Sequence, residues 1–170
     1  MIIEFALSQN IECSIDKTFS FLSDLRNMPR WNYFIQRVTK ISEGKVEVGT
    51  IYEQKRSRDK FLVKVVEFTP PHKAMFQLQP PGPDLLIGFS LIEKEGQTHV
   101  QYNWKLDVQY YLVLKYIPTG AFKNWILSVI EKQILTKTKP AVEQNFAKLK
   151  TLLETGEVVL QDGRKMKLNN

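Results

Sequence analysis

The chain has 170 residues, a length typical of a single domain with a substantial apolar core. Its 43 % apolar and 25 % charged residues exclude a disordered tail and a bundle of membrane-spanning helices. A formal net charge of +6, from 24 Lys and Arg against 18 Asp and Glu, favours contact with anionic surfaces without identifying one.

The chain begins with a predicted strand followed by two short helices. Residues 2–12 mostly alternate apolar and polar side chains, which is typical of a half-buried strand. Ser14 is the predicted N-cap of the first helix, because its hydroxyl can accept a hydrogen bond from a backbone N–H of the first turn. Asn27 is a second predicted cap, and Pro29 fits the first turn of a short helix that ends at Trp31.

Six further strands are predicted between residues 34 and 109. Turn signals rich in Gly, Pro and Asp separate them, and the short connections favour antiparallel neighbours. With the first strand, the predicted sheet has about seven strands. We place the six strands at residues 34–42, 48–57, 60–69, 73–79, 85–94 and 97–109.

A long C-terminal helix is predicted from Pro118 to about Glu154. Apolar residues recur along it with a period of about 3.6 residues, so one stripe should pack on the sheet. Pro140 lies inside this pattern and predicts a kink near residues 137–140, because proline removes a backbone donor and clashes with the preceding turn.

The domain organisation follows from these elements. Residues 1–155 are predicted to form one domain, and residues 156–170 to follow it as a C-terminal tail. This tail is either loosely held or adds one strand at residues 158–160.

The sequence indicates the cytoplasm as the compartment. Cys13 is the only cysteine, so no intrachain disulfide can form. The first residues lack the basic and apolar regions of a secretory signal. Polar and charged residues interrupt the apolar residues between 108 and 135 well short of about 18, so no membrane-spanning helix is expected.

Five short motifs stand out along the chain: Phe19-x-Phe21-Leu22, Asp24, Pro29-x-Trp31, Val48-Gly49-Thr50-x-Tyr52 and Glu95-Gly96-Gln97-Thr98-x-Val100. Together with the order of one strand, two small helices, six antiparallel strands and a long helix, they resemble the helix-grip fold of the START-like, or SRPBCC, superfamily. Across residues 3–155 the chain is most similar to the polyketide cyclase/dehydrase and lipid-transport branch. The resemblance implies an α+β fold in which a curved antiparallel sheet grips the helix around an apolar cavity for a lipid, polyketide or isoprenoid-like molecule.

Packing considerations predict such a space between sheet and helix independently of the resemblance. A strongly bent sheet cannot lie flush on a straight helix, so either large side chains or a ligand must fill the space between them. The 10 Phe, 6 Tyr and 3 Trp could fill it, whereas small residues such as Gly88 and Ala121 could leave it open. The sequence leaves both alternatives open.

Candidate ligand contacts lie on two of the predicted strands. Tyr52, Gln54 and Arg56 share one strand face by the two-residue period, and the family resemblance places this face toward the cavity. Arg56 could hold a ligand carboxylate or phosphate through paired N–H bonds while Tyr52 supplies a hydroxyl. The alternative is a solvated strand end with Arg56 paired to a surface acid.

Aromatic and aliphatic residues complete the predicted contacts. Tyr102 and Trp104 lie on the apolar face of the last strand, where they either line the pocket or form core. The predicted ligand contacts are Tyr52, Gln54, Arg56, Phe76, Phe89, Tyr102, Trp104, Trp125 and Val129.

No recognisable catalytic motif is present. HExxH, CxxC, Walker and GxSxG patterns are absent, and with two isolated histidines and one cysteine neither a metal nor a cofactor is expected. A cyclase-like reaction needs only one or two polar groups beside a folded substrate, and Tyr52, Glu53 and Arg56 are the nearest candidates. Binding or transfer of a hydrophobic small molecule is therefore preferred over the alternative, a cyclase- or dehydratase-type enzyme.

Two surfaces suggest further partners. The aromatic segment Tyr110–Trp125 predicts peripheral membrane contact, with a buried packing segment or a dimer contact as alternatives. Lysines along the long helix alternate with Glu131, Glu143 and Glu154, which is typical of a solvated face, so nucleic acid is not expected as a partner. The third hypothesis is an interaction module with a filled cavity that contacts RNA, the ribosome or a membrane surface.

Overall fold

The computed structural model describes residues 1–108, 114 and 116–168. The chain starts with strand β1 (Ile2–Ile11), helix α1 (Ile15–Ser23) and the 3₁₀ helix η1 (Leu25–Arg30). The next six strands are β2 (Arg37–Lys40), β3 (Ile51–Lys55), β4 (Lys60–Thr69), β5 (Lys73–Leu78), β6 (Asp84–Lys94) and β7 (Gln97–Asp107). The C-terminal elements are α3 (Ala121–Gln133), the π-helical turn η3 (Ile134–Thr138), α4 (Lys139–Thr155), β8 (Glu157–Val159) and β9 (Lys165–Lys167).

The two short N-terminal helices have different caps. The predicted cap of α1 is confirmed, because the Ser14 hydroxyl accepts a hydrogen bond from the Lys17 N–H at 3.4 Å. The predicted cap of η1 is wrong: the Asp24 carboxylate accepts from the Arg26 N–H at 3.0 Å, so this helix begins before Asn27. The Asn27 amide instead donates to the Phe21 carbonyl at 2.9 Å and ties the two helices together.

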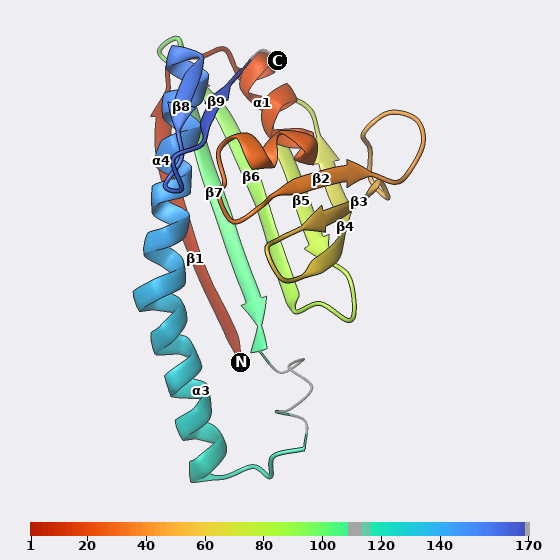
Figure 1. The fold of residues 1–170 in the computed structure, drawn as a ribbon, viewed down its shortest axis with the longest axis vertical. Coiled ribbons are helices and arrows are strands. Elements are labelled where there is room, and N and C mark those ends of the chain that lie inside the picture. Colours follow the sequence, from red (N-terminus) through yellow and green to blue (C-terminus); the bar gives the residue numbers. More distant parts are fainter. Residues whose placement is uncertain (109–113, 115, 169–170) are drawn as a thin grey trace.

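Seven antiparallel strands form one sheet in the order β1-β7-β6-β5-β4-β3-β2 (Figure 1). The predicted α+β architecture is therefore confirmed. Strands β2 and β3 are shorter than the ranges predicted from the sequence. One reason is Gly49, whose φ of 96° lies in the left-handed region and delays the start of β3 until Ile51.

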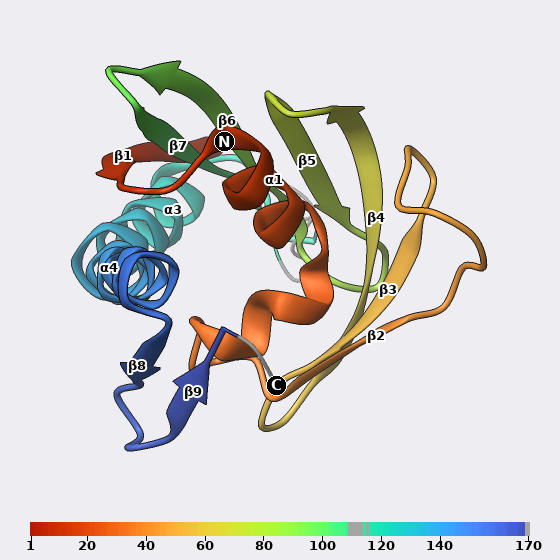
Figure 2. The ribbon, with the colours of Figure 1, turned by 90° about the horizontal axis from the view of Figure 1, so that it is seen from above.

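The sheet is strongly curved. Seen from above, its strands follow an arc, and α1, η1 and α4 close the open side (Figure 2). The register between β4 and β5 shifts between Val65 and Glu67, as at a β-bulge. Gly88 on β6 lies opposite Met75 on β5, where an added Cβ would sit 2.9 Å from Met75 Cα. These two features let the central strands bend and approach closely.

The concave face of the sheet carries the core. On β7, Thr98, Val100, Tyr102, Trp104 and Leu106 are buried, whereas the alternate residues face outward as predicted. The core residues contributed by the helices include Phe19, Leu22, Leu25, Phe146, Leu149 and Leu153.

The C-terminal helix runs for 35 residues and is interrupted once. Pro140 cannot donate a hydrogen bond to the carbonyl four residues earlier, and the π-helical turn η3 directly precedes α4, in whose first turn this proline lies. The interruption predicted near residues 137–140 thus takes the form of a π turn that begins at Ile134. Each helix in the described part of the chain is too short or too polar to span a lipid bilayer.

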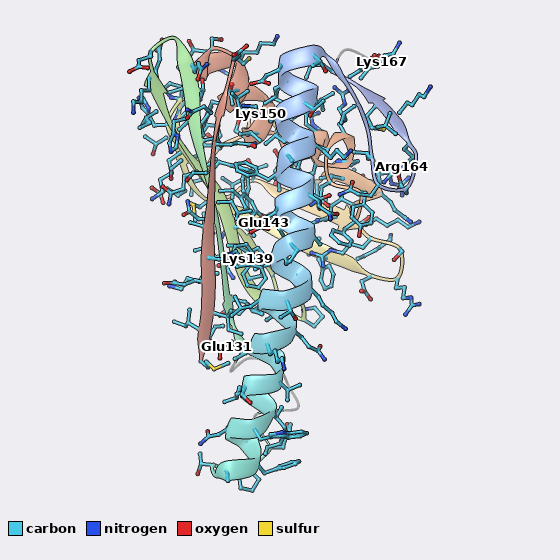
Figure 3. All side chains as sticks on the ribbon, turned by 90° about the vertical axis from the view of Figure 1, so that its left-hand side faces the viewer. Glu131, Lys139, Glu143, Lys150, Arg164 and Lys167 are labelled. Atoms are coloured by element: carbon cyan, nitrogen blue, oxygen red, sulfur yellow. The ribbon has the colours of Figure 1, made fainter. Side chains whose placement is uncertain are left out.

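The two halves of this helix have different surroundings. α4 packs on the sheet and buries five residues, whereas α3 extends past the ends of β1 and β7 and buries none (Figure 1). Charged residues follow both halves, including Glu131, Lys139, Glu143 and Lys150 (Figure 3). The ion pairs Lys139–Glu143 at 4.0 Å and Lys150–Glu154 at 3.4 Å are those of a solvated helix face.

The segment after α4 forms a hairpin. The strand predicted at residues 158–160 is one half of it, and the antiparallel β9 is the other. Val158 and Leu160 are buried, and the Arg30 guanidinium donates to the Leu168 carbonyl at 2.6 Å. The hairpin is thereby packed against η1.

Candidate ligand-binding site

A pocket of about 470 Å³ lies between the concave face of the sheet and the C-terminal helix. This volume is in the range of about 300–1,000 Å³ that small-molecule sites commonly have. Residues from η1, β3, the β3–β4 turn, β5, β6, β7, η3 and α4 line it. The aromatic side chains therefore leave part of the space between sheet and helix open.

Most of the pocket wall is apolar. Leu78, Leu85 and Ile87 come from β5 and β6, and Met28 and Ile35 come from the N-terminal side of the fold. All five side chains are buried, so they form a preformed apolar surface rather than a solvated groove.

Aromatic packing fixes the β7 side of the pocket. The Trp104 ring stacks on Phe5 of β1 with ring centroids 4.9 Å apart and planes inclined by 14°. The Tyr102 ring packs against the rings of Phe89 and of Phe146 on α4, with ring centroids 5.1 Å and 5.9 Å apart. Both lining residues are therefore held by the core behind them.

Three polar side chains reach the same pocket from the sheet. Gln54 and Tyr102 are 3 % and 5 % exposed, and no described residue forms a hydrogen bond with either side chain. The Arg56 guanidinium lies over the Phe61 ring, with Cζ 4.9 Å from the ring centroid. Burial raises the pKa of Tyr102 well above its usual range, although the nearby charge of Arg56 opposes this shift. Its hydroxyl is therefore protonated at neutral pH and available as a donor.

Four of the nine predicted ligand contacts line this pocket: Gln54, Arg56, Tyr102 and Trp104. Of the others, Phe76, Phe89 and Tyr52 are fully buried in the core and lie outside the lining. Phe89 packs edge-on against Trp31, with ring centroids 6.2 Å apart. The N-terminal helices thus cover part of the concave face that the sequence alone leaves open to a ligand.

The two helix residues predicted as contacts lie elsewhere. Trp125 and Val129 belong to α3 and are 61 % and 37 % exposed, beyond the part of the helix that faces the pocket. That part is formed by Lys137, Thr138, Ala141 and Val142, none of which is among the predicted ligand contacts. Apolar residues recur with the same period in both halves of the helix. The sequence pattern therefore does not predict which half packs on the sheet.

The structure does not bring the three candidate catalytic residues together. Arg56 lines the pocket, whereas Tyr52 is buried near Asp24, and burial followed by this negative charge raises its pKa to about 12. Glu53 alternates to the other strand face, where its carboxylate pairs with the Lys60 ammonium at 3.3 Å. Within the described part of the chain, no group of three or more His, Cys, Asp or Glu side chains is placed to hold a metal ion.

Comparison with solved structures places the fold among known ones. The dimer of Aha1 from Colwellia psychrerythraea is 19 % identical, with a TM-score of 0.55 over 91 % of this chain and 98 % of that one. A protein from Nitrosospira multiformis is 11 % identical, with a TM-score of 0.57 over 90 % and 97 %. Ara h 8.0201 is 13 % identical, with a TM-score of 0.56 over 90 % and 98 %. At these identities the likeness shows the shared helix-grip fold.

Sequence comparison supplies the family. No curated protein matches this chain in sequence. One family model, described as polyketide cyclase/dehydrase and lipid transport, matches residues 3–154, which include every strand of the large sheet and nearly all of the C-terminal helix. The chain belongs to the polyketide cyclase/dehydrase and lipid transport family.

Proposed function

We propose that this protein binds a hydrophobic small molecule, such as a lipid, polyketide or isoprenoid-like compound, in the pocket between the sheet and the C-terminal helix. The observation that carries the proposal is a pocket of about 470 Å³ whose buried apolar wall comes from the sheet and the N-terminal segment, with the half-buried Ala141 and Val142 of α4 on the helix side. Membership in a family described by lipid transport and polyketide chemistry supports the same role. The separation of Tyr52 and Glu53 from the pocket favours binding over catalysis by the predicted residues.

A pair of alanines on α4 provides the test. Ala141 lines the pocket, whereas Ala147 is exposed on the same helix. Ala141→Trp places an indole in the space that the ligand needs, so the affinity for the uncharged fluorescent probe Nile red should fall at least about tenfold. Ala147→Trp adds the same group outside the pocket and should bind like the wild type. Equal affinities for the three proteins would contradict the proposal.

We also propose that α3 contacts an anionic membrane surface, where the ligand can exchange. Phe122 and Trp125 are 65 % and 61 % exposed, with ring centroids 6.1 Å apart, and Lys123 and Lys132 lie on the same helix. Exposed aromatics beside lysines suit the headgroup region of anionic lipid. Of the segment Tyr110–Trp125 predicted for this role, residues 110–113 and 115 lie outside the described residues.

Vesicle flotation tests this second proposal. The wild type should float with phosphatidylglycerol vesicles more than with phosphatidylcholine vesicles, because the lysines add attraction only to anionic lipid. Phe122→Ser combined with Trp125→Ser should abolish flotation. Val159→Ser, at an exposed apolar residue of β8, is the matched control and should float like the wild type. Flotation unchanged in the α3 variant would refute the membrane contact.

A further inference from the structure

We propose that the ligand is an amphipathic carboxylic acid whose carboxylate is held by Arg56, Gln54 and Tyr102 and whose apolar body lies along β6 and the helix. This inference rests on the proposed function, since it names the class of molecule that the same pocket selects. It follows from three observations: polar side chains in the pocket without a protein partner, an excess of positive charge around it, and an apolar wall in the same pocket.

Polar groups without a protein partner are the first observation. Gln54 and Tyr102 are 3 % and 5 % exposed, and no described residue forms a hydrogen bond with either side chain. Both side chains line the pocket, so a molecule bound in the pocket can supply the partner.

Charge is the second observation. Among the described residues, Arg56, Arg58 and Lys137 line the pocket against one acid, Asp59. Arg58 and Lys137 are exposed at its edge, whereas Arg56 is half-buried and stacked on Phe61. The charge around the pocket therefore favours an anion, and the guanidinium of Arg56 is one of the groups that line the pocket.

The donor count fits a carboxylate. A carboxylate offers two oxygens with about four acceptor positions. The guanidinium of Arg56 and the amide of Gln54 carry N–H donors, and Tyr102 carries an O–H donor, which are the groups that bind a carboxylate. The high pKa of Tyr102 keeps that O–H protonated when an anion is bound.

The apolar wall determines the rest of the molecule. Leu78, Leu85 and Ile87 offer no hydrogen-bonding side-chain atoms, and they lie in the same pocket as the polar group. A ligand that is charged at one end and hydrocarbon along its length satisfies both parts at once. A small anion without an apolar body would leave this wall exposed to water.

Two ligands of equal chain length test the inference. Dodecanoic acid and dodecanol differ only in the head group, and each can be titrated against bound Nile red. The wild type should bind the acid at least about tenfold more tightly than the alcohol. Arg56→Met should lose this preference while still binding the alcohol. Arg37→Met, which removes an exposed arginine on β2, is the matched control and should keep the preference.

Further variants and ligands make each outcome decisive. Tyr102→Phe keeps the ring packing and removes only the hydroxyl, so it should lower the preference for the acid several-fold even if Arg56→Met folds poorly. Equal binding of acid and alcohol by the wild type would overturn the inference and leave the proposed function intact. Tighter binding of dodecyl phosphate than of dodecanoic acid would overturn the assignment to carboxylates. If dodecanoic acid, dodecanol and Nile red all fail to bind, the proposed function itself is contradicted.

Discussion

Asn145 links the three parts of the chain that meet at one end of the pocket. It is 1 % exposed on α4; its side-chain Nδ2 donates to the side-chain Oδ1 of Asn32 at 3.0 Å, and its own Oδ1 accepts from the side-chain amide of Gln161 at 3.0 Å. Asn145→Ala removes both hydrogen bonds. At about 0.5–1.5 kcal/mol for each bond, the free energy of unfolding should fall by about 1–3 kcal/mol. For a chain of this size, the melting temperature should fall by about 2–4 °C for each kcal/mol lost.

Urea unfolding followed by circular dichroism measures this change, because the midpoint and slope give the free energy of unfolding in water. Gln144→Ala, at the exposed neighbour on the same helix, should stay within about 0.5 kcal/mol of the wild type. If Asn145→Ala is as stable as Gln144→Ala, the hydrogen bonds do not hold α4 to the N-terminal segment, and this part of the account is refuted.

Three further predictions concern the scaffold. Gly88→Ala should destabilise the fold by about 1–3 kcal/mol in urea, since the new Cβ meets the backbone of Met75, whereas a change within about 0.5 kcal/mol would show that β5 and β6 can separate freely. Leu160→Ala should cost about 2–5 kcal/mol if the C-terminal hairpin is packed as described, and an unchanged melting temperature would contradict that packing. The pKa of Tyr52 is raised to about 12 in the folded protein, so on raising the pH the unfolded chain loses the Tyr52 proton before the folded protein does. The free energy of unfolding should therefore fall as the pH rises from about 10 to about 12. Tyr52→Phe should show a smaller loss over that interval, and identical pH dependence in both proteins would refute the assignment.

The sequence was sufficient to predict the order of the helices and strands and which residues lie on the inner face of the sheet. Alternation of apolar and polar residues predicts which side of a strand is buried, and on β7 it separates Tyr102 and Trp104 from their solvent-facing neighbours correctly. Local chemistry also predicts the cap at Ser14. These features depend on a few neighbouring residues, so they can be read without the rest of the fold.

The position of the pocket depends on contacts between distant segments. Tyr52 and Gln54 share one strand face, yet one is covered beside η1 and the other lines the pocket. Trp125 and Ala141 belong to the same long helix, but the length of the sheet decides that the half containing Ala141 faces it and the half containing Trp125 does not. Such differences are set by where η1 and the helix cross the sheet, which periodicity does not specify.

Native mass spectrometry of the protein purified without detergent tests the occupied pocket most directly. The account predicts an added mass of one small molecule per chain, released on unfolding, present in Ala147→Trp and absent from Ala141→Trp. The same bound mass in both variants would place the ligand outside the pocket. Wild-type protein that carries no such mass and gains none when incubated with dodecanoic acid would contradict the central claim.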